Sequence, residues 1–260
     1  MSKAIYTATS GMLLDMRRQE VIARNLAATN IPGFKREYML SHAFKKAMDS
    51  ELQNDNPTNE MNGTTPGVVK VDFTQGNLRN TERPLDFAIN GDGFFEITTN
   101  DNQKLYTRNG AFFVSGEGKL VTAEGYPISG DGSDIQFATD DNLGTLQVTG
   151  DGLLRVRQGP DANYAMKEIG AVKVVAIDNT DKLKRISANY FTFSDPNAAQ
   201  PNQQEPEKYK LLNNFLEAAN SEPVQDMVAM IECQRQFDMG QRLLRMLQES
   251  YSQEFRYYNV

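Results

Sequence analysis

Apolar residues near the end of the chain follow the spacing of a long helix. Within residues 221–260 they recur at steps of three and four, or at sums of these steps, which is the periodicity of one helical face. At a rise of 1.5 Å per residue, a helix over this segment is about 55 Å long. An ordinary domain core cannot cover such a length, so the sequence predicts a partner outside the domain. The stripe consists of Val224, Met227, Val228, Ile231, Phe237, Leu244, Leu247, Tyr251 and Phe255.

A second helical stripe occupies the start of the chain, over residues 4–28. Asn30-Ile31-Pro32-Gly33 ends this helix, because proline disfavours helix before it and glycine suits a reversal. Gly11 interrupts the helix and is expected to allow close approach of another helix. A weaker helical pattern follows over residues 38–48. The stripe of the first helix consists of Ile5, Ala8, Met12, Met16, Ile22 and Leu26.

Between the two helices the pattern changes to short β-like runs separated by turn residues. Their spacing of about ten residues, with glycine at the turns, favours an all-β sandwich or barrel. Polar stretches flank this region at residues 49–66 and 194–207 and are interpreted as linkers. Strands are expected near residues 68–73, 85–89, 94–98, 104–108, 111–114, 120–122, 146–149, 153–157, 172–177, 183–187 and 190–193.

The predicted fold class is α+β. The long N- and C-terminal helices pair as a coiled coil, and the chain between them forms a discontinuous all-β central domain, because the two flanking linkers let both helices leave it on the same side. The expected parts are an N-terminal helix in 1–33, a short helix and polar linker in 34–66, a central β domain in 67–193, a polar linker and lead-in in 194–220, and a C-terminal helix in 221–260.

Charge is distributed unevenly along the chain. The formal net charge is −7, which argues against a general nucleic-acid binder. Residues 1–48 carry +5, residues 221–260 carry −2 and the middle carries −10. The basic first segment and the acidic last segment would attract each other weakly, or both are simply solvated helix faces. The sequence holds no run of eighteen apolar residues, so no transmembrane helix is expected. The first residues also lack the apolar run of a secretory signal.

Candidate chemistry is sparse. The Gly-Asp-Gly triplets at 91–93, 130–132 and 150–152 are interpreted as turns between strands, since none is followed by the carboxylate ladder of a calcium loop. His42 and Cys233 are the only histidine and cysteine, so no catalytic, metal-binding or cofactor-binding constellation and no internal disulfide is predicted. A monomeric β-rich binding or enzymatic domain with helical appendages, and a protein lying on a membrane surface, are the alternatives from other classes.

Three stretches resemble one family, the axial proteins of the bacterial flagellum, which are its rod and hook proteins. They lie near both ends and in the middle of the chain, in residues 22–35, 76–130 and 216–237, so the resemblance extends over essentially its whole length. Within the family, the opening Ala4-Ile5-Tyr6-Thr7-Ala8 and the Arg-Pro-Leu-Asp motif are most similar to the proximal-rod type. The distal-rod type is close behind, and a short hook-type axial protein is a further alternative. Arg24 and Cys233 depart from the family pattern. The matching motifs are Asn25-Leu26-Ala27, Gly33-Phe34-Lys35, Arg83-Pro84-Leu85-Asp86, Gly91-Asp92-Gly93-Phe94, Tyr106-Thr107-Arg108-Asn109-Gly110, Pro223-Val224 and Gln234-Arg235-Gln236-Phe237.

The resemblance implies a structural subunit of the flagellar rod, with no enzymatic activity and no cofactor. Such subunits form the drive shaft that passes torque from motor to hook, with the paired terminal helices in an inner tube. The implied partners are the protein itself, neighbouring rod and hook proteins, and the flagellar type III export apparatus. Nucleic acid and direct membrane insertion are not expected, and the implied location is the basal body.

An assembly interface is therefore expected on the terminal helices, which should order only when they assemble. Asn25, Gln234 and Arg235 are hypothesised to fix register as polar positions within it, although they could simply face solvent. The expected interface residues are Ile5, Met12, Met16, Ile22, Asn25, Leu26, Gly33, Phe34, Val224, Met227, Ile231, Gln234, Arg235, Phe237 and Leu244.

Overall fold

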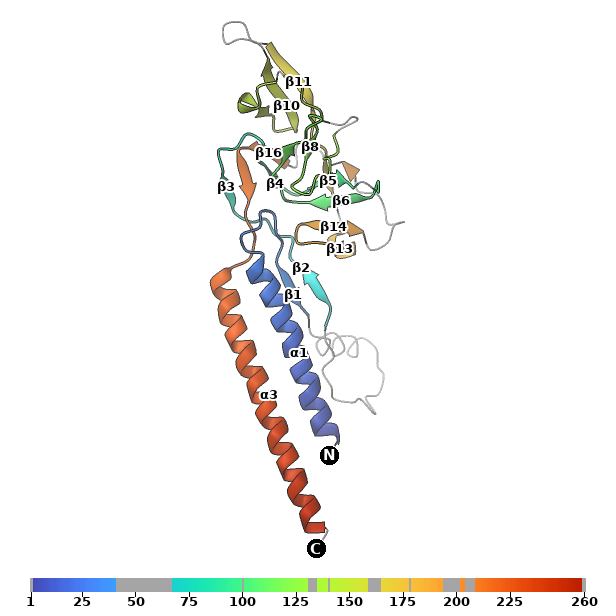
Figure 1. Ribbon diagram of the computed structural model, residues 1–260, viewed down its shortest axis with the longest axis vertical. Coiled ribbons are helices and arrows are strands. Elements are labelled where there is room, and N and C mark those ends of the chain that lie inside the picture. Colours follow the sequence, from blue (N-terminus) through green and yellow to red (C-terminus); the bar gives the residue numbers. More distant parts are fainter. Residues whose placement is uncertain are drawn as a thin grey trace, which may run out of the picture. The chain divides into compact units, whose positions relative to one another are not determined.

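The computed structural model divides the chain into two compact units (Figure 1). The helical unit comprises Met1–Ala27, Arg36–Asp72 and Ser221–Val260, and the β unit comprises Ala28–Lys35 and Phe73–Asn220. The residues that the structure describes are 2–40, 67–99, 101–130, 135–139, 141–158, 165–177, 179–193, 202–203 and 209–258. From these unit bounds, the chain passes between the units four times, after residues 27, 35, 72 and 220.

Two long helices dominate the helical unit. Helix α1 spans Ser2–Ala27 and helix α3 spans Pro223–Tyr258, close to the bounds that their apolar periodicity predicts. The helices pack side by side, with the two chain ends at the same end of the pair (Figure 1). Helix α3 begins at a proline and carries Asp226 in its first turn, where a negative charge complements the helix dipole.

A short antiparallel ribbon completes the helical unit. Strand β1, Glu37–Met39, pairs with β2, Val69–Val71, in the register Glu37↔Val71. The helix expected over residues 38–48 is wrong at its start, because backbone pairing with β2 takes Tyr38 and Met39 into a strand. The rest of that expected helix, including His42, and the polar stretch 49–66 lie outside the described residues.

The β unit is built around a six-stranded antiparallel sheet in the order β13-β14-β6-β5-β12-β15. Smaller sheets surround it, in the orders β11-β10-β9, β16-β4, β17-β3 and β7-β8, rather than the second large sheet of a sandwich. The strands are β3 Leu78–Asn80, β4 Phe87–Gly91, β5 Phe94–Thr98, β6 Lys104–Thr107, β7 Phe113–Val114, β8 Leu120–Val121, β9 Gln147–Val148, β10 Leu153–Gln158, β11 Ala165–Ala171, β12 Val174–Ala176, β13 Leu183–Arg185, β14 Tyr190–Phe193, β15 Asn202–Gln203, β16 Tyr209–Asn213 and β17 Phe215–Glu217.

One hydrophobic core joins these sheets. It is filled mainly by aromatic and branched side chains of β4, β5 and the segments that follow them, and Phe95 meets Phe112 edge to face with ring centroids 5.3 Å apart. Two short 3-10 turns, Leu143–Thr145 and Thr180–Lys182, are the described helical segments of this unit. The mixed architecture of terminal helices and a mainly β centre agrees with the predicted fold class.

The linker and lead-in expected over residues 194–220 are wrong where the structure describes them. Strand β16 pairs with β4 along five residues, from Tyr209↔Gly91 to Asn213↔Phe87, and β17 pairs with β3. The β unit therefore extends to Asn220. It also includes residues 28–33 from the expected N-terminal helical part and residues 34–35 from the expected short helix and linker. Conversely, β2 belongs to the helical unit and not to the central β domain.

The Gly-Asp-Gly interpretation is confirmed where it can be followed. Gly91 and Gly93 have φ of 114° and 132° at the turn from β4 to β5, and Gly152 has φ of 89° in the hairpin between β9 and β10. These positive values favour glycine over residues with a side chain. Strands β4 and β5 pair with other strands, so their turn passes between sheets and does not form a hairpin. The triplet at 130–132 lies partly outside the described residues.

Candidate interaction surface

The contact between α1 and α3 is formed by positions at alternating steps of three and four in both helices. This average of 3.5 residues is the spacing of a coiled-coil seam. The shielded positions on α1 are Ile5, Ala8, Met12, Asp15, Gln19, Ile22 and Leu26. The shielded positions on α3 are Asp226, Met230, Cys233, Phe237, Gly240, Leu244 and Leu247.

Small residues let the helices approach closely along this seam. A Cβ atom on Gly240 would lie 2.8 Å from Cγ of Met12, whereas a Cβ on Gly11 would meet nothing within 4 Å. The close-approach glycine is therefore Gly240, and the expectation for Gly11 is not met within the chain. The thiol of Cys233 is buried and donates to the backbone oxygen of Asp15 at 3.2 Å. Burial raises the pKa of this thiol, so Cys233 serves as a small seam residue rather than a nucleophile.

Helix α3 carries a second apolar stripe on the side opposite the seam. At 100° per residue its positions spread over about 160° of the helix circumference and are centred roughly opposite the seam positions. They are between 50% and 74% exposed. Burying one such side chain contributes about 1.5–3 kcal/mol of favourable free energy. Covering the stripe with a partner would therefore strongly favour association. This outer stripe consists of Val224, Met227, Val228, Ile231, Met239, Leu243 and Met246.

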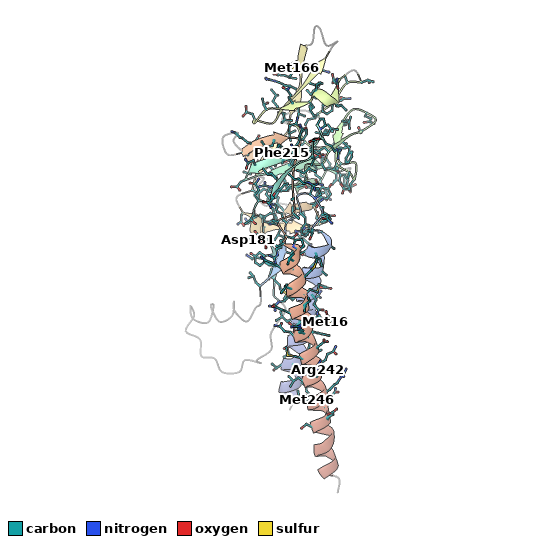
Figure 2. All side chains as sticks on the ribbon, turned by 90° about the vertical axis from the view of Figure 1, so that its left-hand side faces the viewer. Met16, Met166, Asp181, Phe215, Arg242 and Met246 are labelled. Atoms are coloured by element: carbon teal, nitrogen blue, oxygen red, sulfur yellow. The ribbon has the colours of Figure 1, made fainter. Side chains whose placement is uncertain are left out.

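Helix α1 adds fewer exposed apolar residues. Tyr6, Leu13 and Met16 are 50%, 47% and 52% exposed. Figure 2 shows Met16 on α1 and Met246 on α3 of the helix pair. Exposed apolar side chains along both helices are a mark of a protein–protein interaction surface.

The sequence prediction merged the two sides of α3 into one stripe, because sums of three and four also connect opposite faces. The expected residues Ile5, Met12, Ile22, Leu26, Phe237 and Leu244 lie on the seam within the chain. The expected residues Met16, Val224, Met227, Ile231, Gln234 and Arg235 are exposed. The remaining three, Asn25, Gly33 and Phe34, are buried elsewhere in the chain.

Asn25 holds strand β1 against the end of α1. Its side-chain amide donates to the Glu37 carbonyl at 2.8 Å, and its side-chain oxygen accepts from the Glu37 N–H at 2.9 Å. The side chain is 2% exposed. Asn25 therefore completes the hydrogen bonds of the strand backbone, as a neighbouring strand would, which is a role that the sequence prediction did not include.

An ion pair joins the basic first segment to the acidic last segment. Nη2 of Arg36 lies 2.7 Å from Oδ1 of Asp226, which is fully buried in the first turn of α3. The expected attraction between the segments thus takes the form of a specific contact with a buried carboxylate, which resists screening by salt better than an exposed pair. No pattern in the sequence singled out Asp226.

The Gly33-Phe34-Lys35 motif belongs to the β unit. Gly33 has φ of +69°, and a Cβ there would lie 2.4 Å from the backbone of Arg108 and Asn109. Phe34 is 3% exposed, and the guanidinium of Arg185 lies 4.6 Å from its ring centroid. This motif is therefore part of the β-unit packing and is not an exposed contact surface.

The described residues hold no group of three or more His, Cys, Asp or Glu that could bind a metal ion. In the same part of the chain, no helix combines the length and apolar character needed to cross a membrane. A hollow of about 480 Å³ in the β unit is lined by the turn at 29–32, by Arg79 and by residues 216–219, which offer no catalytic constellation.

Comparisons with known proteins match a central part of the β unit, its C-terminal end and most of the last helix. Residues 88–157 match the family model described as Flagellar hook protein FlgE/F/G D1 domain, and residues 212–253 match Flagellar basal body rod FlgEFG protein C-terminal. Flagellar basal-body rod protein FlgF of Caulobacter vibrioides is 30% identical over 244 residues, covering 94% of this chain and 93% of that protein. The chain belongs to the flagellar basal-body rod protein family. FlgG of Bacillus subtilis is a further relative, 28% identical over 255 residues with 94% of each chain covered.

Rod-family membership fixes the class of function. The chain is a structural subunit of the bacterial flagellar rod, located in the basal body, and it is not an enzyme. Membership also implies assembly with other rod and hook proteins of the flagellum. The resemblance drawn from the three motif stretches is confirmed, and the alternative of a monomeric enzyme with helical appendages is wrong.

Proposed function

We propose that this rod subunit assembles helically through its terminal helices into a shaft that transmits torque from the motor to the hook. The observation that carries the proposal is the outer stripe of α3, which is apolar, exposed and opposite the contact with α1. A helix pair that buries one seam and leaves a second stripe open on α3 can add neighbours sideways. Repetition of such a contact between unlike surfaces gives a helical array that need not close.

The heptad-like seam supports pairing of α1 and α3 as a coiled coil in the assembled rod. Its spacing of three and four is regular, but Asp15, Gln19 and Gly240 interrupt the apolar side chains. Such a seam stabilises an isolated pair weakly, since polar residues at core positions set register at a cost in stability. Neighbouring subunits on the outer stripe would supply the burial that completes the inner tube, and the exposed Gln234 and Arg235 beside it could set register there.

The rod position is proposed to be proximal, with the distal rod second. The motifs at the start of the chain favour the proximal type, while relatives named FlgF and FlgG match with similar identity, for example 28% and 29%. Delivery through the flagellar type III export apparatus is part of the same proposal, in line with a single cysteine that forms no disulfide. The net charge of −7 supports protein partners and not nucleic acid.

The proposal is tested by placing charge on the outer stripe. In a strain that lacks the native gene, the double substitution Met227→Glu/Ile231→Glu should abolish motility and leave basal bodies without a complete rod. Gln225→Glu/Gln236→Glu, which adds the same charge at exposed polar positions of α3, is the matched control and should swim normally. Complete rods and normal motility in the Met227/Ile231 variant, at equal protein levels, would sink the proposal.

A further inference from the structure

Three charged side chains lie buried next to one another in the β unit. Lys35, Glu217 and Arg108 are 0%, 1% and 4% exposed. Nζ of Lys35 lies 2.6 Å from Oε1 of Glu217, and Nη1 of Arg108 lies 3.4 Å from Oε2. Burial lowers the pKa of the Arg108 guanidinium, and the neighbouring Glu217 carboxylate opposes this shift. One carboxylate thus lies between two buried cations, and Asp92 adds a further negative charge near Arg108.

The same three side chains also bind backbone from separate parts of the chain. Nζ of Lys35 donates to the Thr74 carbonyl at 2.7 Å, and the Gly76 N–H donates to Oε1 of Glu217 at 2.9 Å. The main-chain carbonyl of Glu217, and not its carboxylate, accepts from the Gly33 N–H at 2.7 Å. Glu217 is therefore bonded to residues 33, 35 and 76, which come from two segments distant from it in sequence.

These segments are the ones by which the chain enters and leaves the β unit. The chain crosses between the units after residues 27, 35, 72 and 220. The turn that contains Gly33 follows the first crossing, and Lys35 is the last residue before the second. Thr74 lies two residues after the crossing at 72, and Glu217 lies three residues before the crossing at 220. Asn220 adds a link, since its side-chain amide donates to the Thr74 carbonyl at 3.1 Å.

The backbone is tightly packed next to the cluster, so that a side chain at Gly76 would not fit. A Cβ on Gly76 would lie 2.1 Å from the Ala218 carbonyl oxygen. On the far side, Nη2 of Arg185 donates to the Lys35 carbonyl, and the guanidinium lies 4.6 Å from the Phe34 ring and 5.0 Å from the Phe191 ring. The Phe34-Lys35 dipeptide is therefore held by its side chains and by its backbone.

We propose that the Glu217 carboxylate is a junction clamp, a positioning group that fastens residues 28–35, 73–77 and 215–220 to one point of the β unit. The clamp orders the chain crossings and is not required for the fold of the core sheet, whose strands β5 and β6 pair without it. This property belongs to the β unit by itself and does not depend on the proposed mode of assembly.

The first test is amide hydrogen exchange of the full chain carrying Glu217→Gln. The substitution keeps the shape of the side chain and removes the charge that neutralises Lys35 and Arg108. Exchange at Gly76 should rise about tenfold or more, because the neutral amide oxygen accepts its N–H more weakly than the carboxylate. The amides of Gly33 and Asn220, which bond to the main-chain oxygens of Glu217 and Phe34, should also exchange faster, because the loosened crossing opens more easily. Amides of Ile97 and Leu105 in β5 and β6 should keep wild-type rates. Glu168→Gln, which breaks the exposed pair with Arg155, is the control and should change none of these amides.

Two results would overturn the clamp. Unchanged exchange at the crossings would show that packing alone fixes them, and an equal rise throughout β5 and β6 would make Glu217 a general stabilising residue. A second variant, Lys35→Met/Arg108→Met/Glu217→Leu, removes the three charges together and leaves no unpaired cation in the cluster. It should stay folded and still exchange rapidly at Gly76, which has lost its acceptor. Wild-type protection of Gly76 in this variant would also contradict the proposal, whatever the outcome of the motility experiment.

Discussion

At the scale of single residues, buried polar side chains do more to organise this chain than exposed ones. Asn25, Asp226 and Glu217 are each at most 2% exposed, and each bonds to a residue far away in sequence. A buried polar group without its partner costs about 1–3 kcal/mol, and a buried charge costs more. Each of these residues therefore selects one arrangement of distant segments, which an apolar residue could not do.

Asn25 gives a prediction at this scale. Asn25→Asp removes the N–H that donates to the Glu37 carbonyl and places a carboxylate next to that oxygen. The helical unit should lose about 2–3 kcal/mol of unfolding free energy, since a donor is lost and a charge is buried. Thermal unfolding followed at 222 nm is the measurement. Asn30→Asp, at an exposed position, should leave the midpoint unchanged, and an equal loss in both variants would contradict the role of Asn25.

Asp15 gives a prediction about pH. Burial on the seam raises the pKa of this carboxyl above its usual value, although Arg18 acts in the opposite direction. A raised folded-state pKa means that the ionised form is less favourable in the folded chain than in the unfolded chain. The contribution of Asp15 to stability therefore falls as pH rises from the usual carboxyl pKa through the raised folded-state pKa. Asp15→Asn should therefore raise the melting temperature at pH 7 and have little effect near pH 3. A larger gain at pH 3 than at pH 7 would contradict the sign.

At the scale of helices, two glycines make a matched pair. Glycine inside a helix costs about 1 kcal/mol relative to alanine. Gly11→Ala should recover that amount, because a Cβ there meets nothing within 4 Å. Gly240→Ala should gain little or nothing, because its Cβ would come within 2.8 Å of Met12 and force that side chain to move. Urea unfolding of both variants measures the difference, and an equal gain at the two positions would show that α1 and α3 do not approach closely in solution.

The same scale shows how far the sequence leads. Periodicity locates both helices and most strands of the central region, because burial of one face leaves a repeat in the sequence. It does not separate the two apolar sides of α3, since steps of three and four sum to positions on either side. It also misses β16 and β17, which are short and follow a proline-rich stretch, and whose partners β4 and β3 lie more than a hundred residues earlier.

The interaction residues divide along the same line. Val224, Met227 and Ile231 could be predicted because exposed apolar side chains keep helical spacing. Glu217 and Asp226 could not, because a single acid in a sequence carries no sign that its partner is Lys35 or Arg36. Family motifs pointed to Gly33-Phe34-Lys35. The place of this motif in the β unit depends on the contact between Lys35 and Glu217, which are 182 residues apart in the sequence.

At the scale of the whole molecule, the two units differ in how their stability is built. The β unit encloses a continuous aromatic and aliphatic core, whereas the helical unit buries one seam interrupted by Asp15, Gln19 and Gly240 and leaves the outer stripe of α3 in water. Units with separate cores of unequal size unfold separately. The isolated subunit should therefore lose helix first and its β core at higher temperature.

The first transition should also depend on protein concentration. Contacts that neighbouring subunits make with the outer stripe stabilise only the ordered helix, so association shifts helix formation by mass action. Circular dichroism at 222 nm over a hundredfold dilution should show helicity that falls on dilution, while near-ultraviolet signals from the β core stay constant. In Met227→Glu/Ile231→Glu this concentration dependence should disappear and the β-core transition should stay where it is. A dilute wild-type monomer with full helicity and one shared transition would show instead that the α1–α3 seam is self-sufficient and that assembly adds nothing to its order.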